Sequence, residues 1–239
     1  MILRNILTLA YKETRSYYSS PMAYVVGSVF LALAGHFLVS GLSRPVPEAS
    51  LREMLTPLTF AIILWGPIAT MRLLAEEQKL GTLEFLMTTP IKEGEIVLGK
   101  FIALLAMFLG IVIPTFLYVG LISWYGNPDT GPLLTGYVGL LLYGGAAASL
   151  GLFTSSLSSN QIIAGATSAV ALLFLTLADQ AADVVAGAPS ALLRSLSLPG
   201  HYNGFVEGVI EISDVSYFVT FIAFFLLLTT LSLETRRWR

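Results

Sequence analysis

The sequence predicts an all-α membrane protein with six membrane-spanning helices. Of its 239 residues, 55% are hydrophobic and only 12% are charged, and the mean hydropathy is +0.78. A soluble domain carries about a quarter of charged residues, so a soluble fold of this composition would lack polar surface. The apolar residues form continuous runs of about 20, the length of a membrane-spanning helix. A membrane barrel would instead show alternating segments of about 10 residues.

Six stretches have the length and hydrophobicity of a membrane-spanning helix. We place them at residues 21–41, 57–75, 99–123, 133–156, 161–180 and 216–234. Pro67 and Pro114 lie inside two of them, so we expect kinks there. The small residues of GGAAASLG, at 144–151, permit close helix packing within the chain or in a dimer. The whole chain, residues 1–239, is predicted to form a single membrane domain.

Lysine and arginine are distributed unequally between the two sides of the predicted membrane. Ten lie on the side of the termini and of the connector at 76–98, and three lie on the other side, at Arg44, Arg52 and Arg194. Positive residues are enriched on the cytoplasmic side of membrane proteins. We therefore expect a multi-pass protein of the inner (plasma) membrane, surrounded by the lipid bilayer, with both termini in the cytoplasm.

Several function classes are disfavoured by the composition. The net charge of −2 gives no reason to expect nucleic acid, and the absence of cysteine removes a thiolate nucleophile. The two histidines, His36 and His201, cannot assemble the three or four ligands of a zinc site, so we expect no metal. Few ionisable residues lie in the middle of the spans, which argues against an ion-coupled carrier and against an intramembrane hydrolase. We assign no catalytic residue and expect no enzyme activity.

Residues 1–18 are predicted to form an amphipathic helix that lies in the membrane interface. Arg4, Lys12 and Arg15 fall on a polar arc of about 120°, and apolar side chains cover the rest of the surface. Glu13 falls within the apolar arc, near its edge. Its carboxylate therefore needs a partner, such as a cation on the connector.

The connector between the second and third spans gathers much of the charge of the chain. Gly81 can end one helix and Thr82 can cap the next, which Pro90 stops. The resulting short helix is amphipathic, and the residues alone leave two interpretations open. It could dock into a groove of another protein, or it could cap its own bundle. Arg72 could likewise pair with Glu76, four residues on, or form a gating link to the N-terminal helix.

The external segment 181–215 is predicted to contain two short helices. We place them at 189–196 and 201–211, separated at Pro199-Gly200, with Phe205, Val209 and Ile212 on one face of the second. Such a hairpin could dip into the outer leaflet or simply cap the surface. Ser213 and Asp214 are expected to cap the last span.

The connector also carries a family resemblance. The stretch TMRLLAEEQKLGTLEFLMTTPIKEGEIVLGK, at 70–100, resembles the signature of type-2 ABC exporter permeases, closest to the gliding-motility and copper-enzyme-maturation permeases. The matching residues are Met71, Arg72, Ala75, Glu76, Glu77, Gly81, Thr82, Leu83, Glu84, Thr89, Pro90, Leu98, Gly99 and Lys100. Two further blocks support it: Lys12, Glu13, Ser20, Pro21 and Tyr24, and then His201, Phe205, Gly208, Asp214 and Tyr217.

The resemblance implies that residues 82–89 form a coupling helix that docks into an ATPase subunit. The residues that it assigns to this contact are Glu76, Glu77, Lys79, Gly81, Thr82, Leu83, Glu84, Phe85, Thr89 and Pro90. The N-terminal helix, with Arg4, Lys12, Glu13 and Arg15, would be the elbow helix. Arg72, Gly208 and Asp214 are candidates for a gating or structural role, and the external helices would be short and re-entrant.

The partners and the function follow from the same resemblance. The expected partners are two copies of a P-loop ATPase and a second permease half, which completes a homodimer or a pair with a related chain. An envelope or substrate-binding subunit could join them. The chain has no G-x-x-x-x-G-K-[ST] loop, so no cofactor is bound directly and ATP and Mg belong to the partner.

We expect a permease subunit of an ABC exporter. Two alternatives stay open: a non-transporting membrane anchor or force-transmitting subunit of a cell-envelope complex, and an ion-coupled carrier.

Overall fold

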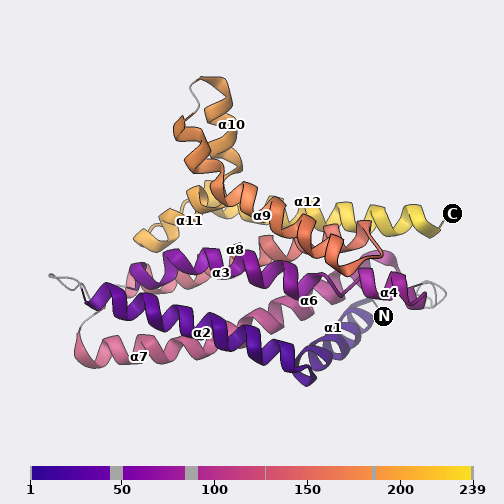
Figure 1. Cartoon of the computed structure of the whole chain (residues 1–239), viewed down its shortest axis with the longest axis horizontal. Coiled ribbons are helices and arrows are strands. Elements are labelled where there is room, and N and C mark those ends of the chain that lie inside the picture. The colour runs from indigo at the N-terminus through magenta and orange to yellow at the C-terminus, as the bar shows by residue number, and fades with distance from the viewer. Residues whose placement is uncertain (1, 44–50, 84–90, 127, 185–186, 238–239) are drawn as a thin grey trace.

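The computed structural model describes residues 2–43, 51–83, 91–126, 128–184 and 187–237, and the regular elements in these ranges are all helices (Figure 1). In chain order they are α1 (Ile2–Ser19), α2 (Pro21–Leu42), α3 (Arg52–Thr70), α4 (Ala75–Lys79), α6 (Glu93–Val112), the 3-10 turn η1 (Ile113–Thr115), α7 (Phe116–Tyr125), α8 (Thr130–Leu157), α9 (Gln161–Val184), α10 (Ala188–Leu196), α11 (Leu198–Glu207) and α12 (Ile212–Arg237).

In the described part of the chain, six helices are long and apolar enough to cross a membrane, which confirms the predicted number. They run over Pro21–Leu42, Arg52–Lys79, Glu93–Trp124, Thr130–Leu157, Gln161–Val184 and Ile212–Thr235. The third is interrupted at Pro114, where η1 joins α6 to α7, as the missing amide hydrogen of proline favours. It also begins at Glu93, earlier than predicted, because a polar first turn that contains Glu93 and Glu95 continues the helix beyond its apolar part.

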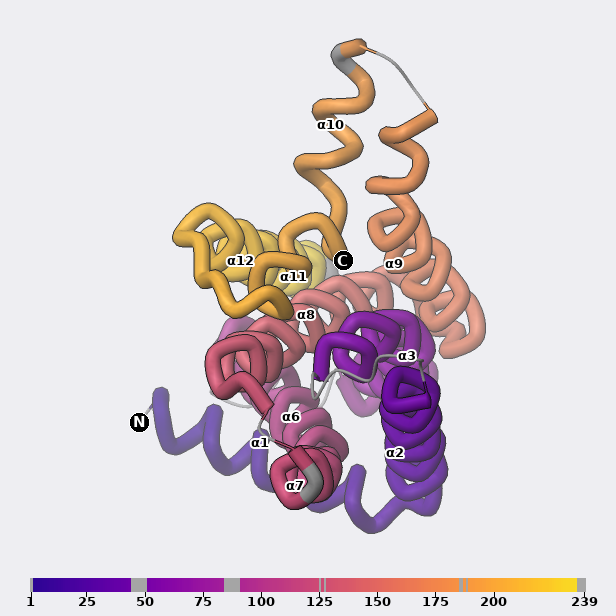
Figure 2. Tube along the Cα trace, turned by 90° about the vertical axis from the view of Figure 1, so that its left-hand side faces the viewer, coloured from indigo at the N-terminus to yellow at the C-terminus, as the bar shows by residue number. Residues whose placement is uncertain are grey.

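Helix α8 occupies the centre of the bundle, with α3, α6, α9 and α12 around it (Figure 2). Every residue from Tyr143 to Leu152 is buried. Glycines in this stretch let neighbouring side chains reach the α8 backbone: the ring of Phe108 lies against Gly144, and Thr70 lies against Gly151. The stretch of small residues therefore serves packing within the chain.

Helix α1 lies across one end of the bundle, at a large angle to the spans (Figures 1 and 2). Ser20 caps α2, because its hydroxyl accepts a hydrogen bond from the backbone amide of Met22, and Pro21 opens the helix. Leu9 and Ala10 of α1 are buried, whereas Leu3 and Tyr11 are each 71% exposed. This end of the bundle, which carries α1, α4 and both termini, is called the charged end below.

At the opposite end, α10 and α11 confirm two short helices but correct their boundaries. The break falls at Ser197, and Pro199 lies in the first turn of α11, a position where proline costs no hydrogen bond. Gly208 ends α11 in the left-handed conformation, with φ 91°. The predicted shared face is wrong, because Phe205 is buried whereas Val209 and Ile212 lie beyond the helix end and are exposed.

The expected capping role of Asp214 is also corrected. Asp214 lies inside the first turn of α12, and its Oδ1 lies 2.8 Å from Nδ1 of His201. The imidazole ring of His201 stacks on Tyr217, with the ring centroids 3.9 Å apart. Ser213 donates its hydroxyl hydrogen bond to Glu211. Asp214 therefore fastens α11 to α12.

The central packing predicts that Gly144→Ala destabilises the fold. The added methyl group would meet the ring of the fully buried Phe108, and overpacking of this kind costs about 1–3 kcal/mol. Gly120→Ala is the matched control, because no atom lies within 4 Å of the methyl group that it adds on α7. Thermal unfolding in detergent should show a lower midpoint for Gly144→Ala alone. Equal midpoints for the two variants would contradict this packing.

Candidate functional site at the junction of α1, α4 and α6

The side chain of Lys100 is fully buried at the charged end and has three oxygen partners. Its Nζ lies 2.7 Å from Oε1 of Glu77, 3.3 Å from Oε1 of Glu13 and 3.0 Å from the carbonyl oxygen of Leu73. A buried ammonium needs charge compensation and hydrogen bonds, and this arrangement supplies both. Lys100 therefore joins α6 to α1, to α4 and to the turn that precedes α4.

Two further features fix α1 on α6. Gly99 allows the close approach, because a Cβ atom at this position would lie only 3.0 Å from Cβ of Leu9. Asn5 donates a hydrogen bond of 2.9 Å to Oε2 of Glu95, whose side chain is buried. The contact between the two helices thus combines close packing with polar pairs at both ends of α1.

The connector is bound to α8 as well. The hydroxyl of Ser155 accepts hydrogen bonds from the backbone amides of Leu74 and Ala75, at 3.2 and 3.1 Å. The side-chain amide of Gln78 donates to the carbonyl oxygen of Ser156 at 3.0 Å. These bonds satisfy amides at the start of α4 that would otherwise lack partners. The connector is therefore fastened both to the central helix and, through Lys100, to α1.

The structure places the predicted connector residues as follows. Gly81 ends the α4 segment with φ 69°, as expected of a glycine after a helix. Thr82 lies in a helical segment, and its hydroxyl donates a hydrogen bond to the carbonyl oxygen of Glu77. The amides that Thr82 was expected to cap belong to residues outside the described part of the chain. Leu83 is buried, whereas Lys79 is exposed. Glu84, Phe85, Thr89 and Pro90 lie outside the described residues.

The predicted residues of α1 divide into two groups. Glu13 lies where α1, α4 and α6 meet, called the junction here. The cation that pairs with it is Lys100, on α6. Arg4, Lys12 and Arg15 are exposed on the polar face of the helix. Of the two roles considered for Arg72, the pair with Glu76 does not form: within the described parts of the chain neither side chain has a hydrogen bond or ion pair, although the backbone amide of Glu76 donates to the carbonyl oxygen of Arg72 at 3.2 Å, the spacing of a helix. Gly208 and Asp214 lie at the opposite end.

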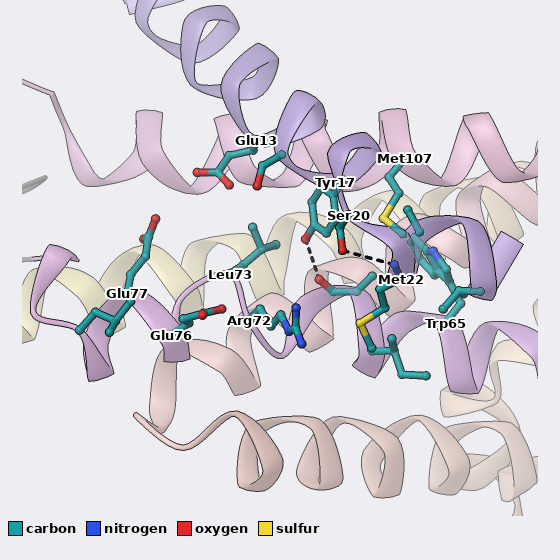
Figure 3. Close-up of a pocket in the computed structure, with 16 residues that line it drawn as sticks. Glu13, Tyr17, Ser20, Met22, Trp65, Arg72, Leu73, Glu76, Glu77 and Met107 are labelled. Atoms are coloured by element: carbon teal, nitrogen blue, oxygen red, sulfur yellow. Dashed lines mark hydrogen bonds between the residues drawn. The ribbon is translucent and has the colours of Figure 1, made fainter.

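A cavity of about 400 Å³ adjoins the junction (Figure 3). Its wall includes Glu13 and Tyr17 from α1, Trp65 from α3, and Arg72 and Glu76 beside and within α4. The phenol of Tyr17 donates a hydrogen bond of 2.6 Å to the carbonyl of Ala69. Burial, and next the negative charge of Glu13, raise the pKa of Tyr17 well above its usual value. The phenol therefore stays protonated and keeps this link between α1 and α3.

Several residues of this site were missed from the sequence. Lys100 was placed among the cytoplasmic cations and in the family signature at the start of the third span, and Asn5 on the polar arc of the N-terminal helix, but neither contact was predicted. Glu95 and Ser155 were given no role. The available signal was Glu13, a carboxylate on an apolar arc that requires a buried cation nearby. Among the described residues, no three histidine, aspartate or glutamate side chains gather as they would around a metal ion.

The junction predicts that Lys100→Met weakens the fold more than any loss of an exposed lysine. Removing one partner of a buried ion pair leaves uncompensated charge and costs about 3–5 kcal/mol. Lys92→Met removes an exposed lysine directly before the same helix and is the control. We expect a large decrease of the unfolding midpoint for Lys100→Met only.

A second variant separates lost charge pairing from lost packing at this position. Adding Glu77→Gln to Lys100→Met removes the nearest uncompensated carboxylate and should restore part of the midpoint. A double variant less stable than Lys100→Met would show that the ion pair is not what stabilises the junction.

A comparison with known protein families agrees with this architecture. The family model described as ABC-2 family transporter protein matches residues 7–236, which is nearly the whole chain and includes most of α1, the connector and the six spans found among the described residues. No curated protein matches the chain. Membership of this family makes the chain a membrane permease subunit and implies an ABC ATPase subunit as its partner. This chain therefore belongs to the ABC-2 family of transporter proteins.

Proposed function

We propose that this chain is one half of the permease of an ABC exporter, and that an ATPase subunit acts on it through the connector. Family membership supports the ATPase partner, and the chain itself has no P-loop to bind ATP. Two permease halves, as a homodimer or with a related chain, would associate with two ATPase subunits. The direction of transport and the subgroup of gliding-motility and copper-enzyme-maturation permeases belong to the same proposal.

The proposal places the charged end in the cytoplasm of the cell, at the inner membrane. Ten of the thirteen lysine and arginine residues belong to this side, in agreement with the positive-inside rule. Both termini lie at the same end of the bundle as α4 (Figure 1). An ATPase in the cytoplasm would therefore meet the connector and α1 together.

The observation that carries the proposal is the double attachment of the connector. Ser155 joins it to the central helix α8, and Lys100 joins it to α6 and α1. A push on the connector would then move these helices as one body instead of unfolding a loop. The connector ends, within the described residues, at the buried Leu83, directly before the segment that we expect to enter the ATPase.

The test is a pull-down of the tagged chain from its native membrane in a mild detergent, followed by an assay of ATP hydrolysis. We expect a stoichiometric P-loop ATPase in the eluate. Glu84→Lys should decrease its recovery severalfold, because it reverses a charge on the proposed coupling helix. Glu234→Lys makes the same change at an exposed position of α12, at the same end of the bundle, and should leave recovery unchanged.

Other outcomes would overturn parts of the proposal. Equal recovery of the ATPase with both variants would remove the coupling role of the connector. A chain that purifies without any ATPase, under conditions that keep other membrane complexes intact, would favour a self-contained carrier. An ATPase complex that moves no cargo but contains further envelope subunits would favour the force-transmitting role.

A further inference from the structure

Helix α1 leaves one face uncovered that is apolar along one edge and basic along the other. At 100° per residue its three apolar side chains fall within about 80° of one another, and two arginines follow directly beside them. The apolar side chains are 54–71% exposed, and the basic side chains are exposed as well. This face consists of Leu3, Arg4, Leu7, Tyr11, Lys12 and Arg15, and it is called the outer face of α1 below.

The position of α1 keeps this face beside the membrane-spanning part of the bundle. The helix leads directly into the span α2, and it also lies along the first turns of α6, which belongs to another span. Leu9 lies against Gly99, and the hydroxyl of Tyr18 donates a hydrogen bond to the carbonyl oxygen of Ala106. Figures 1 and 2 both place α1 at the edge of the bundle. The outer face is therefore held at the boundary of the membrane.

The outer face carries three positive charges and no negative charge. The only acidic residue of α1 is Glu13, and its carboxylate pairs with Lys100 inside the junction. Apolar side chains bordered by arginine and lysine are typical of a helix that binds an anionic membrane surface. In such a helix the apolar side chains enter the boundary between headgroups and acyl chains, while the cations meet the lipid phosphates. The charge of the face therefore complements an anionic lipid.

We propose that the outer face of α1 binds anionic phospholipids of the leaflet at the charged end. Its apolar side chains would rest on the acyl chains just below the headgroups, and its two guanidinium groups and one ammonium group would bind the lipid phosphates. A zwitterionic lipid is less favoured, because its own ammonium group competes for the phosphate and is repelled by the basic side chains. This assignment rests on the geometry of α1 and does not depend on the identity of an ATPase or a cargo.

A protein partner is the other candidate for this face. Such a partner would have to cover the apolar side chains and also supply acidic residues beside them. The lipid boundary along α6 already provides both an apolar layer and a layer of phosphates at the edge of the bundle. The outer face of α1 thus matches its membrane surroundings without a further chain.

The experiment is native mass spectrometry of the delipidated full-length chain, titrated with phosphatidylglycerol and phosphatidylcholine of equal acyl chains. We expect phosphatidylglycerol to bind about tenfold more tightly, because each basic residue at the headgroups adds to the attraction for an anionic lipid. A higher concentration of ammonium acetate should reduce this preference, since salt screens exposed charges. Equal binding of the two lipids would overturn the proposal.

Two triple variants locate the site on the chain. Arg4→Gln/Lys12→Gln/Arg15→Gln removes the charges of the outer face and should lower the affinity for phosphatidylglycerol about tenfold, to that for phosphatidylcholine. The control, Arg72→Gln/Lys79→Gln/Lys92→Gln, removes three other exposed cations of the charged end and should keep the preference. All six side chains are exposed, so neither variant should change the midpoint of thermal unfolding.

The same variants show which other occupant would replace the lipid. An unchanged affinity for phosphatidylglycerol in the α1 variant would place the lipid elsewhere on the chain. An equal decrease in both variants would show that the whole charged end attracts anions without a site on α1. If the α1 variant kept phosphatidylglycerol but lost the ATPase in the pull-down, the outer face would be a protein contact. Each of these results contradicts the proposal.

Discussion

The buried ammonium of Lys100 is the interaction on which the charged end of this permease depends. It is fully enclosed, and it reaches oxygen atoms from α1, from α4 and from the turn between α3 and α4. An ion in such a place is stable only when each partner is held in position. The requirement acts in both directions, because Glu13 and Glu77 are themselves largely withdrawn from water and need the lysine.

The consequence is that α1 and the connector form one structural unit. Gly99 brings the α1 and α6 backbones close, Asn5 and Glu95 fix their register, and Ser155 holds the start of α4 on α8. Arg72 and Glu76, whose side chains have no ion pair within the described residues, line the cavity beside this unit.

The fold could be predicted well from the sequence because its determinants are local. Six apolar runs of about 20 residues specify six helices, and their number does not depend on tertiary contacts. Pro114 predicted the interruption of the third span, and Gly81 predicted the end of α4, because both effects arise from the backbone of a single residue. The amphipathic character of α1 could also be predicted, because it depends only on the order of residues within that helix.

The candidate site could be predicted only in part, because its contacts join residues far apart in the chain. The position of Glu13 on an apolar arc indicated that its carboxylate needs a cationic partner. The sequence did not identify that partner, because Glu13 and Lys100 are 87 residues apart. The Arg72–Glu76 pair was one of two roles considered from helical spacing; the backbone keeps that spacing, but the two side chains do not pair within the described residues. Asp214 was expected to cap a helix, whereas tertiary packing brings His201 to it. For Asp214, the local capping propensity was therefore overruled by how the helices pack.

The most direct test of the central claim measures whether α1 and α4 move together. The chain has no cysteine, so spin labels can be placed at the exposed Lys12 of α1, Lys79 of α4 and Leu192 of α10 by substitution with cysteine. Electron paramagnetic resonance would give the 12–79 and 79–192 distances in the ATPase complex, with and without ATP and Mg²⁺. We predict a constant 12–79 distance and a changed 79–192 distance, with a broad 12–79 distribution in Lys100→Met. A 12–79 distance that changes with nucleotide in the original chain, and a Lys100→Met variant that behaves identically, would contradict the account.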